Sequence, residues 1–145
     1  MVTIDSGIIL DFPLTWERLA EGSRCVFHTP RREEIIVSAK RVAGDGAAGE
    51  RAMWLDRMVE AGLEAARQGA ASRELRVIQP LAEDTTETCS LRCWTVMAET
   101  ISRDSFYAQA VLRHERGTLF VTYESSFVDG AEPAFRDLLR SIHES

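Results

Sequence analysis

Three consecutive segments that alternate apolar and polar residues constrain the fold of this chain more than any other feature. They lie at residues 88–99, 105–115 and 118–128, and short polar stretches at 102–104 and 116–117 separate them. A period of two residues is typical of β-strands, and connections this short join neighbouring antiparallel strands. The sequence therefore predicts a three-stranded meander.

Further strands are expected before the meander. Residues 8–12, 25–28 and 34–42 are rich in β-branched and aromatic side chains and predict three strands, with a turn around Trp16 and Leu19 after the first. A hairpin at 30–32 joins the second and third of these strands, and a short fourth strand is expected at 75–78.

Two segments have the period of an amphipathic helix. The first runs from Glu50 to Gly69 and carries apolar residues every three or four positions, at Leu55, Met58, Val59, Gly62, Leu63 and Ala66. The second closes the chain and has an apolar stripe of Ala134, Phe135, Leu138, Leu139 and Ile142. Both helices are expected to pack on the sheet.

The order of these elements predicts the fold class. Strands that follow one another form a mainly antiparallel sheet, whereas strands that alternate with helices form a parallel one. A chain of 145 residues is long enough for one core. We therefore expect an α+β fold in a single domain, residues 1–145, with a long mid-chain helix and a C-terminal helix packed on the sheet.

Charge and cysteine content limit the partners and the compartment. The chain has 17 Lys and Arg against 23 Asp and Glu, a formal net charge of -6. Such a protein repels nucleic acid and anionic membranes, so neither is an expected partner. Residues 1–10 lack the pattern of a signal peptide, and Cys25, Cys89 and Cys93 make an odd count, which indicates a cytoplasmic protein.

No motif points convincingly to an enzyme, a cofactor or a metal. Residues 44–49 match G-x-G-x-x-G, but a dinucleotide fold also needs a second parallel strand that ends in an acidic residue about 20 positions on. Cys89 and Cys93, placed on one strand, would lie about 13 Å apart, too far to share a metal. They are read as buried apolar residues, and no catalytic, metal or cofactor residues are assigned.

The meander offers a binding surface instead, because both of its faces are partly apolar. One face must pack under the helices, so the other would present a mixed aromatic, aliphatic and Arg surface typical of protein interfaces. A homodimer would cover such a face as well as a different protein partner. The residues expected to bind a partner are Arg92, Trp94, Val96, Tyr107, Gln109 and Arg113.

Three features resemble the PsbP-like fold, which the photosystem subunit of that name shares with a Ran-binding protein and bacterial DcrB-like proteins. Residues 12–16, FPLTW, resemble the opening strand of that family with its Pro-x-x-Trp motif. The long helix follows the third strand. Residues 132–135, EPAF, open a closing helix with Leu138, Leu139 and Ile142 on one side.

This resemblance implies a non-enzymatic binding module of the DcrB-like branch. Within that branch the chain resembles the type VI effector-associated Eag chaperones and also immunity proteins, so it implies a bacterial cytoplasmic partner of one secreted effector or toxin. An apolar groove and a dimer would indicate the chaperone, and a charged surface complementary to a toxin would indicate immunity. The alternative is a carrier that holds a small ligand between the sheet and the long helix.

Overall fold

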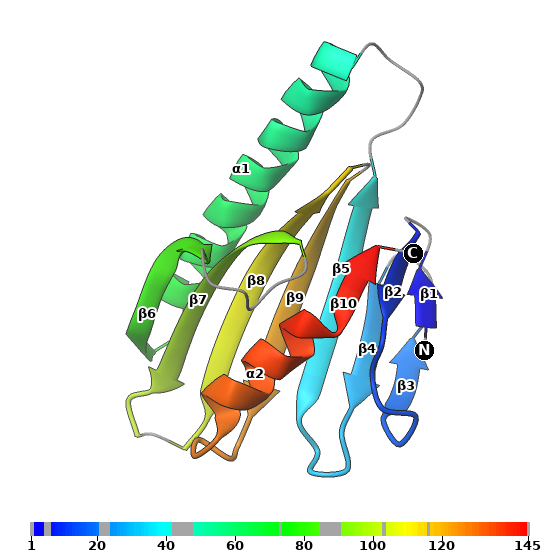
Figure 1. Cartoon of the computed structure of the whole chain (residues 1–145). Helices are drawn as coiled ribbons and strands as arrows, with labels where there is room; N and C mark the ends of the chain where they lie inside the picture. Colours follow the sequence, from blue (N-terminus) through cyan, green and yellow to red (C-terminus); the bar gives the residue numbers. More distant parts are fainter. Residues whose placement is uncertain are drawn as a thin grey trace.

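The protein is a single α+β domain in which two helices lie on a mostly antiparallel sheet (Figure 1). The structure is a computed structural model that describes residues 2–4, 7–20, 24–41, 48–72, 74–84, 91–102, 104–115 and 117–144. This confirms the predicted fold class, including the long mid-chain helix and the C-terminal helix.

Seven of the described strands form the main sheet, in the order β3-β4-β5-β9-β8-β7-β6. Their bounds are β3 Glu17–Ala20, β4 Arg24–His28, β5 Glu34–Arg41, β6 Leu75–Asp84, β7 Arg92–Thr100, β8 Phe106–His114 and β9 Gly117–Ser125. A small sheet has the order β1-β2-β10, with β1 Val2–Ile4, β2 Ile8–Leu10 and β10 Ile142–Glu144. The helices are α1 Ala48–Ser72 and α2 Ala131–Arg140.

The meander is confirmed, because β7 pairs antiparallel with β8 and β8 with β9. The predicted hairpin of β4 and β5 is also present, and β5 then joins the meander by pairing with β9. Several strands differ from the sequence predictions. The expected turn around Trp16 and Leu19 contains β3, β6 continues to Asp84, and β1 and β10 were not predicted.

The two helices lie on opposite faces of the main sheet (Figure 1), and this arrangement corrects the expectation that one face stays open. The ring of Phe135 on α2 lies 5.9 Å from that of Tyr123 on β9. Phe120 points to the other face of β9, where its ring lies against Gly62 of α1. We call the two surfaces the α2-side face and the α1-side face.

The larger core lies on the α2-side face. It buries inward-facing side chains of β4, β5, β7, β8 and β9 against α2 and the small sheet. Ile8, Leu10 and Ile142 of the small sheet and Phe135 and Leu139 of α2 are fully buried in it. The closing apolar stripe predicted from the sequence thus packs as expected, although Ile142 lies in β10 and not in the helix.

Gly117 is required where β9 begins. A β-carbon at this position would collide with the backbone carbonyl oxygen of Lys40 on β5. We expect Gly117→Ala to lower the free energy of unfolding by about 1–3 kcal/mol, because the two backbones must move apart. Urea denaturation measures the change.

Gly49→Ala is the matched control, since a β-carbon there meets nothing within 4 Å. It lies in α1, so alanine should leave stability unchanged or raise it by up to about 1 kcal/mol. Equal effects of the two substitutions would contradict the close approach at Gly117.

Candidate functional site

The six residues expected to bind a partner all lie on the α1-side face. Arg92 is the cross-strand partner of Arg113, and Val96 is the partner of Gln109. Val96 and Tyr107 are each only 4% exposed, Trp94 and Gln109 are partly buried, and Arg92 is exposed. This face is therefore covered at Val96 and Tyr107. Solvent reaches Arg92, Trp94 and Arg113. Partner binding by these residues stays a prediction.

A pocket of about 560 Å³, which we call the arginine pocket, lies where α1 begins and β8 ends. Its guanidinium groups come from Arg51 in the first turn of α1, Arg92 on β7 and Arg113 on β8. The remaining lining residues are Ala52, Leu55, Leu91, His114, Glu115 and Glu144.

Two of these arginines are held in position by neighbours. Arg92 donates from Nε to Glu83 Oε1 at 2.6 Å, and its guanidinium lies 4.9 Å from the ring centre of Trp94. The hydrogen bond from Arg92 lowers the pKa of the Glu83 carboxyl below its ordinary value. Arg113 Nη1 lies 3.1 Å from Asp56 Oδ1 on α1. Their planar donor groups are thus oriented before any partner arrives, which favours recognition of carboxylates.

His114 is a buried residue in the lining of the arginine pocket. Burial lowers the pKa of its imidazole below the ordinary value, and the nearby Glu144 carboxylate opposes this shift in part. The Glu144 Oε1 atom also accepts a hydrogen bond of 3.1 Å from the backbone N–H of Glu115. The small sheet therefore contributes to the pocket through β10.

The sequence could not place these groups together. Arg51, His114 and Glu144 come from α1, the end of β8 and a strand that was not predicted. Arg92 and Arg113 were identified because alternation assigns residues to faces. Arg92 lies opposite Arg113 because of the register in which β7 pairs with β8. In the sequence, only the length of the hairpin connection indicates that register.

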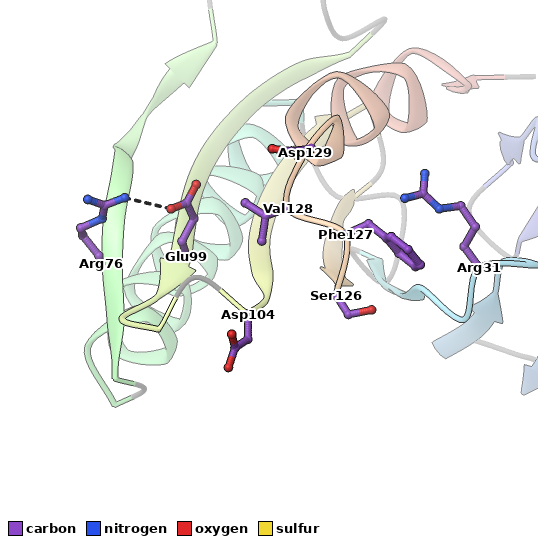
Figure 2. Close-up of a pocket in the computed structure, with 8 residues that line it drawn as sticks. All are labelled: Arg31, Arg76, Glu99, Asp104, Ser126, Phe127, Val128 and Asp129. Carbon is purple, nitrogen blue, oxygen red and sulfur yellow. Dashed lines mark hydrogen bonds and ion pairs between the residues drawn. The ribbon is translucent and has the colours of Figure 1, made fainter.

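A second, larger groove of about 770 Å³ lies at the lower end of the α2-side face (Figure 2). On one side, Arg76 Nη2 lies 2.9 Å from Glu99 Oε2. On the other side, the guanidinium of Arg31 stacks 4.0 Å from the ring centre of Phe127. Figure 2 shows Val128 between these two pairs. Asp104, Ser126 and Asp129 complete the lining.

A buried carboxylate lies in the β4–β5 hairpin that carries Arg31. The Glu33 side chain accepts hydrogen bonds from the hydroxyls of Tyr123 and Thr29. Burial alone would raise the pKa of Glu33, but the hydrogen bonds from Tyr123, Ser125 and Thr29 and the charge of Arg31 outweigh it and lower the pKa. Burial and the Glu33 carboxylate raise the pKa of Tyr123.

This lowered pKa predicts a pH dependence of stability. The unfolded chain binds a proton at Glu33 more readily than the folded protein does, so folding favours the ionised form. The contribution is fully present above the ordinary pKa of 4.5 and is lost as pH falls through the lower value in the fold. The loss of stability caused by Glu33→Gln should therefore be larger at pH 7 than at pH 3 in urea denaturation. Glu64→Gln on exposed α1 is the control, and an equal loss at both pH values would contradict the assignment.

The cysteines differ from the sequence prediction. Cys25 is buried, as expected, but Cys93 is disulfide-bonded. The expectation that both residues of the Cys89–Cys93 pair are simple buried apolar residues is therefore wrong for Cys93, and Cys89 lies outside the described residues. The predicted strand from residue 88 is present as β7 from Arg92 onward, and residues 88–90 lie outside the described residues.

The described part of the chain shows neither a metal-binding cluster nor a membrane-spanning helix. Within it, no group of three or more His, Cys, Asp or Glu side chains is arranged to hold a metal ion. Its helices include none with the length and apolar character of a membrane span. Most of the glycine motif at 44–49 lies outside the described residues.

Comparison with solved structures finds similar folds, among them one that aligns over nearly the whole chain. LpqN from Mycobacterium tuberculosis, described as involved in cell envelope biogenesis, aligns with a TM-score of 0.52 and 12% sequence identity. The alignment covers 93% of this chain and 81% of LpqN. No protein-family model and no curated protein sequence matches. The chain thus has a fold like that of LpqN, which agrees with the PsbP-like expectation at the level of fold.

Proposed function

We propose that this protein is a non-enzymatic module that binds a protein partner through the arginine pocket and the adjoining outer surface of α1. The observation that carries the proposal is the fixed orientation of Arg92 by Glu83 and Trp94 at the rim of an accessible pocket. Oriented arginines beside aromatic side chains are common among the residues that dominate binding energy at interfaces.

The surface of α1 next to the pocket also carries an arginine beside an aromatic side chain. Met53 and Trp54 are 51% and 53% exposed, and the guanidinium of Arg57 lies 5.3 Å from the ring centre of Trp54. This end of α1 projects beyond the ends of the strands β8 and β9 (Figure 1). Trp, Met and Arg are enriched at protein interfaces, whereas Lys is depleted. A protein partner with exposed carboxylates fits this surface.

The disulfide at Cys93 supports a proposal about the compartment. Disulfides persist in oxidising compartments and are rare in the cytoplasm, so we propose that the partner is met outside the cytoplasm. This proposal differs from the cytoplasmic location expected from the sequence. The fold likeness to LpqN is compatible with it. A secreted effector or toxin is the client class implied by the family resemblance, and the bound segment distinguishes an effector chaperone from an immunity protein.

Quantitative affinity capture tests the proposal. The tagged wild-type chain and the variant Arg51→Ala/Arg92→Ala are each used to capture proteins from native cells, and the recovered proteins are compared by mass spectrometry. We expect one stoichiometric partner whose recovery falls at least tenfold with the variant, since two interface arginines at about 1 kcal/mol or more each are lost.

Arg140→Ala is the matched control, because Arg140 is an exposed arginine on α2, paired with Asp137 at 2.8 Å. It should leave recovery unchanged. A partner that wild type and Arg51→Ala/Arg92→Ala recover equally would refute binding at the arginine pocket. The absence of any stoichiometric protein partner would refute the protein-binding module itself.

A further inference from the structure

Three turns at one end of the molecule carry exposed apolar side chains. Leu14 lies between β2 and β3, Ile101 between β7 and β8, and Phe127 between β9 and α2. Figure 1 shows these connections and the β4–β5 hairpin at the end opposite the start of α1, and we call it the turn end. Among the large apolar side chains of the described residues, Leu14 and Ile101 are the most exposed, at 91% and 73%, and Phe127 is 45% exposed. Turns normally carry polar residues, so three apolar ones at one end indicate an apolar contact.

The backbone at these turns is fixed by hydrogen bonds. The N–H of Trp16 donates to the carbonyl oxygen of Pro13 at 3.1 Å, and the N–H of Thr100 donates to that of Ser105 at 3.0 Å. The N–H of Phe127 donates to a serine hydroxyl at 3.0 Å. The three apolar side chains are therefore presented by closed turns, which have little conformational freedom left to lose on binding.

The spread of the turns favours a lipid surface over a protein surface. Five strand spacings separate β3 from β7, so the turn before β3 and the turn after β7 are on the order of 25 Å apart. A protein interface is a closely packed patch with a continuous apolar centre. A bilayer instead accepts separate side chains, each of which buries its own apolar area.

The groove of Figure 2 opens between the same turns and carries charges of both signs. Arg31 comes from the β4–β5 hairpin, Asp104 from the β7–β8 connection and Asp129 from the β9–α2 connection. The guanidinium of Arg31 is held 4.0 Å from the ring centre of Phe127, and Arg76 lines the other side. Arginine binds phosphate through parallel hydrogen bonds, and carboxylates attract an ammonium group. A headgroup with one phosphate and one ammonium group, as in phosphatidylethanolamine, is complementary to these charges.

We propose that the turn end docks on a bilayer of zwitterionic phospholipids. The three apolar side chains enter the boundary between headgroups and acyl chains, and the groove holds one headgroup. The formal net charge of -6 disfavours an anionic bilayer, whereas a zwitterionic bilayer has no net charge to repel the chain. The arginine pocket lies at the start of α1, at the other end of the molecule (Figure 1). Docking at the turn end is therefore independent of partner binding at the arginine pocket.

Vesicle flotation tests the docking. The full chain is mixed with vesicles of equimolar dioleoylphosphatidylethanolamine and dioleoylphosphatidylcholine, and we expect it to float with them. The partition coefficient of Leu14→Ser/Ile101→Ser should be at least about tenfold lower, because two apolar side chains no longer leave water. Its thermal unfolding midpoint should match that of wild type, since both side chains are exposed in the fold. A wild-type chain that does not float, or a double variant that floats equally, would overturn the docking.

Met53→Ser/Trp54→Ser is the matched control for apolar adsorption. These two side chains are 51% and 53% exposed at the start of α1, in the surface proposed for the protein partner. The control should float like wild type, because this end of the molecule faces away from the bilayer. A loss equal to that of Leu14→Ser/Ile101→Ser would show adsorption through any exposed apolar surface and would overturn docking by the turn end.

Two neighbouring arginines test the headgroup site. Arg31 lines the groove, and Arg32, which is exposed on the same hairpin, does not. Arg31→Gln should lower the partition coefficient by at least about fivefold, since it removes a charge-assisted hydrogen bond to phosphate. Arg32→Gln makes the same change of charge and should leave the partition coefficient nearly unchanged. Equal losses would overturn the headgroup site in the groove.

A change of lipid tests the zwitterionic headgroup itself. Vesicles in which dioleoylphosphatidylglycerol replaces dioleoylphosphatidylcholine should bind the wild-type chain more weakly, because the net charge of the chain opposes them. Stronger binding to these anionic vesicles would show a general attraction of the arginines to negative charge and would overturn the choice of a zwitterionic bilayer.

Discussion

Phe135→Ala is expected to lower the free energy of unfolding by about 3–5 kcal/mol. Phe135 is fully buried on α2, and its ring packs against that of Tyr123 at 5.9 Å. The substitution removes most of a large side chain from the junction of α2 with the main sheet, and it leaves a cavity that rigid strands cannot close. Equilibrium urea denaturation, followed by circular dichroism, gives the change from the midpoint and slope.

Arg140→Ala is the control for this experiment, because its side chain lies on the exposed side of the same helix. It should change stability by less than about 0.5 kcal/mol. A change below about 1 kcal/mol for Phe135→Ala would show that α2 is not part of the core.

Arg136→Met is expected to cost about 3 kcal/mol, because it breaks the ionic contact that joins α2 to the edge strand β6. Arg136 Nη1 lies 3.0 Å from Asp84 Oδ2, and Nη2 donates to Gln79 Oε1 at 2.9 Å. The Asp84 side chain is only 3% exposed, so the variant leaves a buried carboxylate without this cation. Methionine keeps the packing of the arginine stem, and urea denaturation reports the loss of the charge.

A second substitution separates charge from packing. In Asp84→Asn/Arg136→Met the buried charge is removed as well, and we expect the double variant to recover more than half of the stability lost by Arg136→Met. Losses that simply add in the double variant would show that the two side chains act independently.

Much of the architecture could be predicted because local patterns determine it. The alternation in β7, β8 and β9 identified strands, and the period of α1 and α2 identified helices. β1, β3 and β10 were missed or read as a turn because each is three or four residues long, too short to show a period. Their pairing depends on distant partners: β10 is held by β2, from the opposite end of the chain.

The placement of the helices could not be predicted from their own sequences. Both faces of the meander are partly apolar, so the pattern allowed both helices on one side and an open sheet on the other. In the structure, Gly62 leaves room for the ring of Phe120, so α1 packs on the face that was expected to be open. For this reason Val96 and Tyr107, chosen as exposed contacts, are buried, while Arg92 is accessible.

Site-specific photo-crosslinking in native cells tests the central claim most directly, namely that a protein partner binds beside the arginine pocket. A benzophenone side chain replaces Trp54 in one variant and Leu14 in another. Leu14 is 91% exposed and belongs to the segment between β2 and β3, which lies at the opposite end of the molecule from the start of α1 (Figure 1). We predict that the probe at position 54 crosslinks one protein and the probe at position 14 does not. Crosslinks from position 14 alone, or none from position 54, would contradict the proposed binding surface.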